Sequence, residues 1–276
     1  MPNLDLKRKK DLSIFRQLAL GTWETSYDSQ VYGTIELEMD RAQEYIDRFR
    51  EKTGKRLTVT HLVAKAVAET LRRYPSANAV LRFGRIYLRK RIGVFMQVAM
   101  TDDDTKPDLS GMTVFDIPDK SLVQLIDEIE GKVAAVRSRQ DPVLEKSRNL
   151  LAMLPGVAIN PTLKLLSLLT IGLNLDLGFL GVPKDPFGSV MVTNIGSLGL
   201  DAAFPPLVPY TRVPILLAIG RVKDTPVVRE GEVVIRKVLK VNATFDHRFI
   251  DGYHAAMMSR ILRDWLENPD EHFDPI

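Results

Sequence analysis

The stretch that decides the fold is Thr244-Phe-Asp-His-Arg-Phe-Ile-Asp-Gly252, near the C-terminus of the 276-residue chain. It follows an apolar, β-branched run over 233–245, which predicts a strand, and it leads into a helical pattern over 251–266. His247 is therefore expected at the end of a strand, where turns often present reactive groups. Local context leaves two interpretations open: a buried, hydrogen-bonded histidine that joins strand to helix, or a catalytic base.

The chain has four histidines, so a mechanism that needs a neutral base near pH 7 has few candidates. The other three indicate structural roles: His61 near a helix start, His254 on the C-terminal helix and His272 in the polar tail. There are no cysteines, which excludes disulfides, thiolate zinc sites and a cysteine nucleophile within this chain. We predict no metal site.

Two separate blocks of sequence resemble one known family. Asp246-His-Arg-Phe-Ile-Asp-Gly252 is similar to the Asp-His-Arg-x-x-Asp-Gly signature of the dihydrolipoyl acyltransferase component of 2-oxoacid dehydrogenase complexes. Chloramphenicol acetyltransferases share its His-x-x-x-Asp core. Met191-Val-Thr-Asn-Ile-Gly-Ser-Leu-Gly199 is similar to the family's Phe-Thr-Ile-Ser-Asn-Leu-Gly stretch, and Tyr74-Pro-Ser-Ala-Asn78 resembles its Phe-Pro-x-x-Asn. The resemblance covers most of the chain.

This resemblance implies a chloramphenicol acetyltransferase-like α/β sandwich, with a mixed β-sheet covered by helices and active sites between subunits. It implies that His247 takes the proton from a thiol and that Thr193, where the family commonly has serine, donates a hydrogen bond to the oxyanion. Asp251 matches an aspartate that helps to hold the active-site geometry, and its position also suits capping of the helix that follows. Coenzyme A or acyl-CoA is then a substrate, and no residue is assigned to binding it.

The implied reaction moves an acyl group directly between coenzyme A and a dihydrolipoamide-like thiol or another small acceptor. The implied assembly is a homotrimer or a larger cage of trimers. Lys106-Pro-Asp-Leu-Ser-Gly-Met112 departs from the family's Gly-Leu-Val-Val-Pro-Val, so we expect a different acceptor pocket. The alternative function is a structural trimer or cage core of a 2-oxoacid dehydrogenase-like assembly, with little or no catalysis.

The pattern along the chain predicts one catalytic domain over 1–276, because helices and strands alternate irregularly around a single mixed sheet. We expect an N-terminal docking arm over 1–28, with a short helix from Asp11 to Leu20. Strands are predicted over 30–39, 86–88, 92–100, 112–117, 190–195, 213–221 and 233–245. Helices are predicted over 40–52, from 58 or 60 to 74, over 121–139 and over 251–266.

An apolar insertion is expected over 149–187. Its part from 149 to 181 contains twelve leucines, and its only charged residues are Lys164 and Asp176. A membrane-spanning helix needs about 20 predominantly apolar residues, and here prolines and glycines interrupt the run. Burial in a subunit interface or a lining for a long acyl chain is therefore favoured, and shallow membrane contact stays open.

Composition limits the partners. The net charge of +3, from 38 basic and 35 acidic residues, is too small and too scattered to indicate nucleic-acid binding. Charged residues interrupt the N-terminus, so we expect no signal peptide and a cytoplasmic protein.

Asp119-Lys120 opens a predicted helix, so we expect no lipoyl group on this chain. A lipoyl-bearing protein or other 2-oxoacid dehydrogenase components are the candidate partners.

Overall fold

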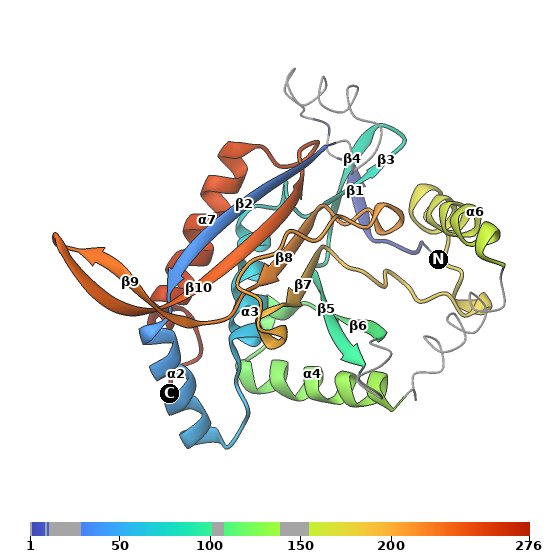
Figure 1. The fold of residues 1–276 in the computed structure, drawn as a ribbon. Helices are drawn as coiled ribbons and strands as arrows, with labels where there is room; N and C mark the ends of the chain where they lie inside the picture. Colours follow the sequence, from blue (N-terminus) through green and yellow to red (C-terminus); the bar gives the residue numbers. More distant parts are fainter. Residues whose placement is uncertain (1, 9, 11–28, 101–107, 139–154) are drawn as a thin grey trace.

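A mixed β-sheet of seven strands lies at the centre of the chain (Figure 1). The computed structural model describes residues 2–8, 10, 29–100, 108–138 and 155–276. The strand order is β2-β10-β8-β7-β5-β6, and β9 pairs with β10 off this path. The strands are β2 Gln30–Glu38, β5 Gly93–Met100, β6 Asp108–Phe115, β7 Val190–Asn194, β8 Ile215–Ile219, β9 Lys223–Arg229 and β10 Glu232–Asp246. β7 runs parallel to β5 and β8, and the other pairs are antiparallel.

A second, smaller sheet has the order β1-β4-β3, with β1 Leu6–Arg8, β3 Ala79–Arg82 and β4 Arg85–Arg89. Of these three strands, only the central residues of β4, 86–88, were predicted from the sequence. β1 is three residues long and two of them are basic, so it lacks the apolar alternation that identifies a strand. Its pairing with β4 supplies the hydrogen bonds instead.

Helices cover one face of the large sheet. They are α2 Asp40–Thr53, α3 Val59–Arg73, α4 Leu122–Arg137 and α7 Gly252–Glu267, close to the predicted bounds, with short helices η1 Ile117–Asp119 and α8 Pro269–His272. Each long helix buries an apolar stripe; that of α2, formed by Ala42, Tyr45, Ile46 and Phe49, packs mainly against α7 and α8. Gly54 caps α2 at φ 67°, a conformation that glycine adopts without steric cost.

The alternation of side chains along β7 shows which way each residue faces. Val190 and Val192 belong to the main core with the helices, whereas Met191 packs in a separate cluster with Leu207 and Leu216. Successive residues of a strand point to opposite faces, so Thr193 shares the face of Met191, away from the helices. We call this the open face of the sheet.

The leucine-rich part of the chain lies beside the small sheet (Figure 1). It forms α6 Gly156–Ser167, a π-helical turn η2 Leu168–Gly172 and a 3₁₀ turn η3 Gly178–Leu180. Several of its large apolar side chains are exposed in the single chain: Ile159, Leu165, Leu168, Leu173, Leu175, Phe179 and Leu180. Within the described ranges, no helix has the length and apolar character needed to cross a membrane. The predicted helix over 11–20 lies outside the described residues.

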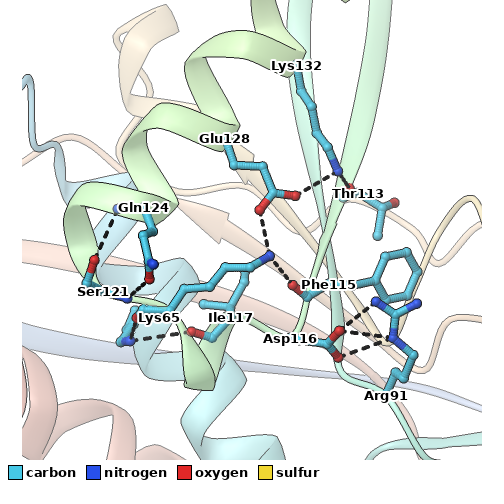
Figure 2. A network of polar contacts seen from close by, with 11 residues as sticks. Lys65, Arg91, Thr113, Phe115, Asp116, Ile117, Ser121, Gln124, Glu128 and Lys132 are labelled. Carbon is cyan, nitrogen blue, oxygen red and sulfur yellow. Dashed lines mark hydrogen bonds and ion pairs between the residues drawn. The ribbon is translucent and has the colours of Figure 1, made fainter.

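Figure 2 shows a network of polar contacts that ties α3, η1, β6 and α4 together. The Lys120 ammonium donates to Glu128 Oε2 at 2.6 Å, and Lys132 donates to the Thr113 carbonyl oxygen at 2.7 Å. Burial alone raises the pKa of Glu128, but hydrogen bonds from Lys120 and Lys132 lower it overall. Lys65 donates to backbone carbonyl oxygens that include those of Ile117 and Lys120. Lys120 is thus part of this network.

Candidate active site

His247 directly follows the last residue of β10, and its backbone is held from two sides. The Asp246 N–H donates to the Pro214 carbonyl oxygen at 2.9 Å, and the His247 N–H donates to the Ser29 carbonyl oxygen at 2.9 Å. Ser29 immediately precedes β2, and Pro214 precedes β8. The half-buried His247 is therefore fixed relative to both strands that flank β10.

A buried ion pair flanks His247 on both sides in sequence. The Arg248 guanidinium donates to both carboxylate oxygens of Asp246, with Nη2 to Oδ2 at 2.6 Å and Nε to Oδ1 at 2.9 Å. Ser29 Oγ donates to Asp246 Oδ1 at 2.8 Å. The side chains are 7% and 3% exposed, so this pair is well shielded from water. The pair closes the turn and limits the orientations open to His247.

Asp251 begins the helix that follows. Its Oδ1 accepts the backbone N–H of His254 at 3.0 Å, which is an N-cap of α7, and lies 2.6 Å from His254 Nδ1. The cap at Asp251 and a structural role for His254 were predicted from the sequence, but the contact between the two side chains was not. Their separation of three residues at a helix start was a signal for that contact.

Thr193 lies near the end of β7 on the open face and is half-buried. The loop after it is tightly built: Asn194 Nδ2 donates to Thr60 Oγ1 at 2.9 Å, and the Ser197 N–H donates to Asn194 Oδ1 at 3.1 Å. A Cβ on Gly196 would lie 2.5 Å from the Gly220 carbonyl oxygen, so the loop requires glycine there. These contacts fix the end of β7 against α3 and β8.

The sheet register keeps Thr193 and His247 of one chain apart. Thr193 is opposite Ala218 on β8, and Ala218 is opposite Asn242 on β10. His247 is thus five residues further along and two strands away. At about 3.4 Å per residue and about 4.8 Å between strands, the two Cα atoms are roughly 20 Å apart. Within one chain, the Thr193 hydroxyl and the His247 imidazole are therefore too far apart to contact the same substrate carbonyl group.

Exposed apolar side chains lie along the open face. Tyr32 on β2 and Phe204 are 57% and 44% exposed and form an edge-to-face pair with centroids 5.5 Å apart. Leu198, in the loop after Thr193, is 70% exposed. Apolar groups gathered on one face mark interaction surfaces. This face therefore has the character of an interaction surface.

The remaining histidines have structural contacts. His61 Nδ1 accepts the Thr58 N–H at 3.1 Å and completes the capping box of α3, which confirms the predicted structural role. Burial, with the charges of Arg56 and Arg50, lowers the pKa of His61 to about 4. His272 Nε2 lies 2.8 Å from Asp264 Oδ2. Across the described part of the chain, no cluster of three acidic or histidine side chains has the arrangement of a metal site.

Comparison with solved structures gives the class of fold. The dihydrolipoamide acetyltransferase of Azotobacter vinelandii matches with a TM-score of 0.64 and 19% identity, covering 95% of this chain and 93% of that one. A chloramphenicol acetyltransferase matches with a TM-score of 0.51 and 14% identity, covering 95% of this chain and 100% of that one. The predicted chloramphenicol acetyltransferase-like sandwich is therefore confirmed.

The family follows from the sequence itself. The model of the 2-oxoacid dehydrogenases acyltransferase family (catalytic domain) matches residues 22–142 and 187–273. The chain belongs to this family. The match leaves out 143–186, which includes the described leucine-rich elements α6, η2 and η3.

Among curated relatives, the dihydrolipoyllysine-residue acetyltransferase component of the Bacillus subtilis acetoin cleaving system is 24% identical over 219 residues. That alignment covers 79% of this chain and 44% of the relative. The chain spans less than half the length of the curated relatives it matches.

Proposed function

We propose that this chain transfers an acyl group between coenzyme A and a dihydrolipoamide-like thiol or another small acceptor, with His247 as the general base. The observation that carries the proposal is the rigid presentation of His247 between the buried Asp246–Arg248 pair and the Asp251 cap of α7. The family membership and the relative's description as an acetyltransferase component support the same reaction class.

The reaction follows from the chemistry of a thiol and a thioester. Neutral His247 accepts the proton of the incoming thiol, and the thiolate attacks the carbonyl carbon of the acyl thioester. A tetrahedral intermediate forms, and a threonine hydroxyl at Thr193 donates a hydrogen bond to its oxygen. Collapse breaks the other C–S bond, and the leaving thiolate takes the proton back from the imidazolium. The acyl group has then moved from one thiol to the other, and no proton is gained or lost overall.

Asp251 acts as a positioning residue in this scheme. Work on the Azotobacter vinelandii enzyme concerns one serine, one histidine and one asparagine in its catalytic mechanism, with the asparagine four residues after the histidine. His247 and Asp251 have the same separation. Because Asp251 caps α7 and contacts His254, it holds the turn in which His247 lies, and we assign it no proton transfer.

The complete site requires two subunits. Thr193 and His247 of one chain are roughly 20 Å apart by the strand geometry, and the open face that carries Thr193 has exposed apolar side chains. We place the threonine of one subunit beside the histidine of its neighbour in a homotrimer or a cage of trimers. The acyl acceptor then comes from a lipoyl-bearing protein or from other components of a 2-oxoacid dehydrogenase complex.

The test is turnover of a panel of acyl-CoAs with dihydrolipoamide as acceptor. We expect His247→Ala to lose about 10²- to 10⁴-fold in kcat, the usual contribution of a general base. His272→Ala is the matched control, because His272 contacts Asp264 and Trp265 near the C-terminus, and it should keep wild-type turnover. Equal rates for His247→Ala and wild type refute the assignment. An assembled wild-type protein that turns over none of the acyl-CoAs favours a purely structural core.

A further inference from the structure

One side of the molecule carries apolar and basic side chains together. It is formed by α6, η2, η3, the turn between β3 and β4, and the N-terminal strand β1; we call it the basic apolar surface (Figure 1). Phe83 at the tip of the β3–β4 turn is 66% exposed, Leu165 on α6 is 54% exposed and Phe179 in η3 is 77% exposed. All three side chains are therefore largely open to solvent in the single chain.

Hydrogen bonds join these segments into one surface. Arg82 Nη2 donates to the Gly172 carbonyl oxygen at 2.9 Å, which fastens the β3–β4 turn to the end of η2. Asn3 Nδ2 donates to the Thr170 carbonyl oxygen at 3.1 Å, and Arg89 pairs with Asp185 at 2.6 Å. The protruding apolar groups are therefore held in place by the small sheet.

The charge of this surface differs from that of the rest of the chain. Its described residues in 2–10, 79–90 and 155–185 include nine lysines and arginines and three aspartates, a net charge of +6. The whole chain carries +3, so the remainder is negative. Two of the three aspartates, Asp5 and Asp185, are paired with cations of the same surface. The exposed cations are Lys7, Arg8, Lys10, Arg85, Lys90, Lys164 and Lys184, of which Lys90 pairs with Asp5.

We propose that the basic apolar surface binds the face of a lipid bilayer that contains anionic lipids. Protruding aromatic and leucine side chains enter the boundary between headgroups and acyl chains, while the lysines and arginines around them pair with anionic headgroups. A symmetric dimer through this surface is disfavoured, because two copies of the surface would bring like charges together.

The family match does not extend over much of this surface. It stops at 142 and resumes at 187, so α6, η2 and η3 lie outside the matched residues. Thr193 and the exposed Tyr32 lie on the open face of the large sheet. The turn that carries His247 is nearer to this surface, because Arg212 donates to the Leu81 carbonyl oxygen of β3 and to Ser167 Oγ of α6. Membrane binding is therefore measured separately from acyl transfer.

The test is co-sedimentation of the full chain with vesicles of phosphatidylcholine alone or with 30 mol% phosphatidylglycerol, which is a composition of about one anionic lipid in three. We expect binding to the anionic vesicles that weakens as salt is raised, because headgroup attraction is screened. Lys10→Glu with Arg85→Glu should weaken binding at least about 25-fold, since each basic residue near an anionic surface contributes about fivefold.

Matched variants separate this surface from a general effect of charge or apolar area. Phe83→Asn with Leu165→Gln should weaken binding about tenfold or more, and asparagine tolerates the positive φ of 48° at position 83. The charge control is Lys52→Glu with Arg260→Glu on α2 and α7. The apolar control is Val233→Thr with Ile235→Thr on β10, where both side chains are exposed. Both controls should bind as wild type does.

Three results overturn the proposal. The first is a wild-type chain that stays in the supernatant with anionic vesicles at low salt. The second is equal binding by the surface variants and their controls. The third is a change of assembly mass, measured by light scattering, in Phe83→Asn with Leu165→Gln while vesicle binding is unchanged, which assigns the surface to contact between subunits. Acyl transfer measured on the same preparations reports on the proposed catalytic function separately.

Discussion

The Asp246–Arg248 pair beside His247 gives the sharpest prediction about stability. Asp246→Ala removes a carboxylate that accepts hydrogen bonds from Arg248 and Ser29, and it leaves the guanidinium buried, since the Arg248 side chain is 7% exposed. Breaking a buried pair by removing one partner costs about 3–5 kcal/mol, because the buried charge that remains loses the carboxylate to which it donated. We expect a fall of this size in the free energy of unfolding.

The chain offers a matched control for this measurement. Arg48 and Asp270 form a pair of the same type at 2.6 Å, but their side chains are 50% and 49% exposed. Removing an exposed pair with Asp270→Ala should cost about 0–1 kcal/mol. Urea unfolding of Asp246→Ala and of Asp270→Ala measures the loss in the free energy of unfolding for each variant. The double variant Asp246→Ala with Arg248→Met should regain part of the loss, because it removes the buried charge. Equal costs for Asp246→Ala and Asp270→Ala would refute the reasoning.

Two further predictions concern His61 and the loop after Thr193. The pKa of His61 is lowered from 6.5 to about 4 in the folded protein. Neutral His61 therefore contributes fully to the free energy of unfolding above pH 6.5, and this contribution is lost as the pH falls toward 4. The wild type should lose about 3 kcal/mol over that window in urea titrations, and His61→Gln should lose distinctly less. Gly196→Ala should lower both stability and acyl transfer, because its Cβ meets the Gly220 carbonyl oxygen. Gly131→Ala should instead stabilise the fold by about 0.5–1 kcal/mol, because a Cβ at this position of α4 meets no neighbouring atom. If Gly131→Ala is less stable than Gly196→Ala, the geometric reasoning is contradicted.

The long helices were predictable because their apolar stripes are regular and their ends are marked. α2 ends where Gly54 adopts its left-handed conformation, and α3 begins at Thr58, whose capping box uses His61. The strands β3 and β9 were not predicted. β9 contains Pro226 and lies at an edge, so its pairing with β10 defines it more than its composition does.

The local structure around the proposed site residues was predictable, but their arrangement in the fold was not. The strand end before His247 and the cap at Asp251 follow from local pattern, and both are found in the structure. The separation of Thr193 from His247 depends on the register of β7, β8 and β10, which residue spacing along the chain does not encode. The exposure of the leucine-rich segment depends on packing against the small sheet.

The shared site can be tested by mixing two inactive subunits. Thr193→Ala should lose about 10²- to 10³-fold in kcat, as removal of one oxyanion donor does, and His247→Ala should be inactive for want of its base. Co-expression of the two variants with different tags, followed by purification on both tags, isolates mixed assemblies.

Any mixed trimer contains one neighbouring pair with an intact histidine and an intact threonine. The proposed arrangement therefore predicts about one third of wild-type acyl-CoA turnover per mixed trimer, since one of its three sites is complete. If the mixed trimers are no more active than the two single variants, His247 and Thr193 do not act together across a subunit boundary, and the account of the active site is contradicted.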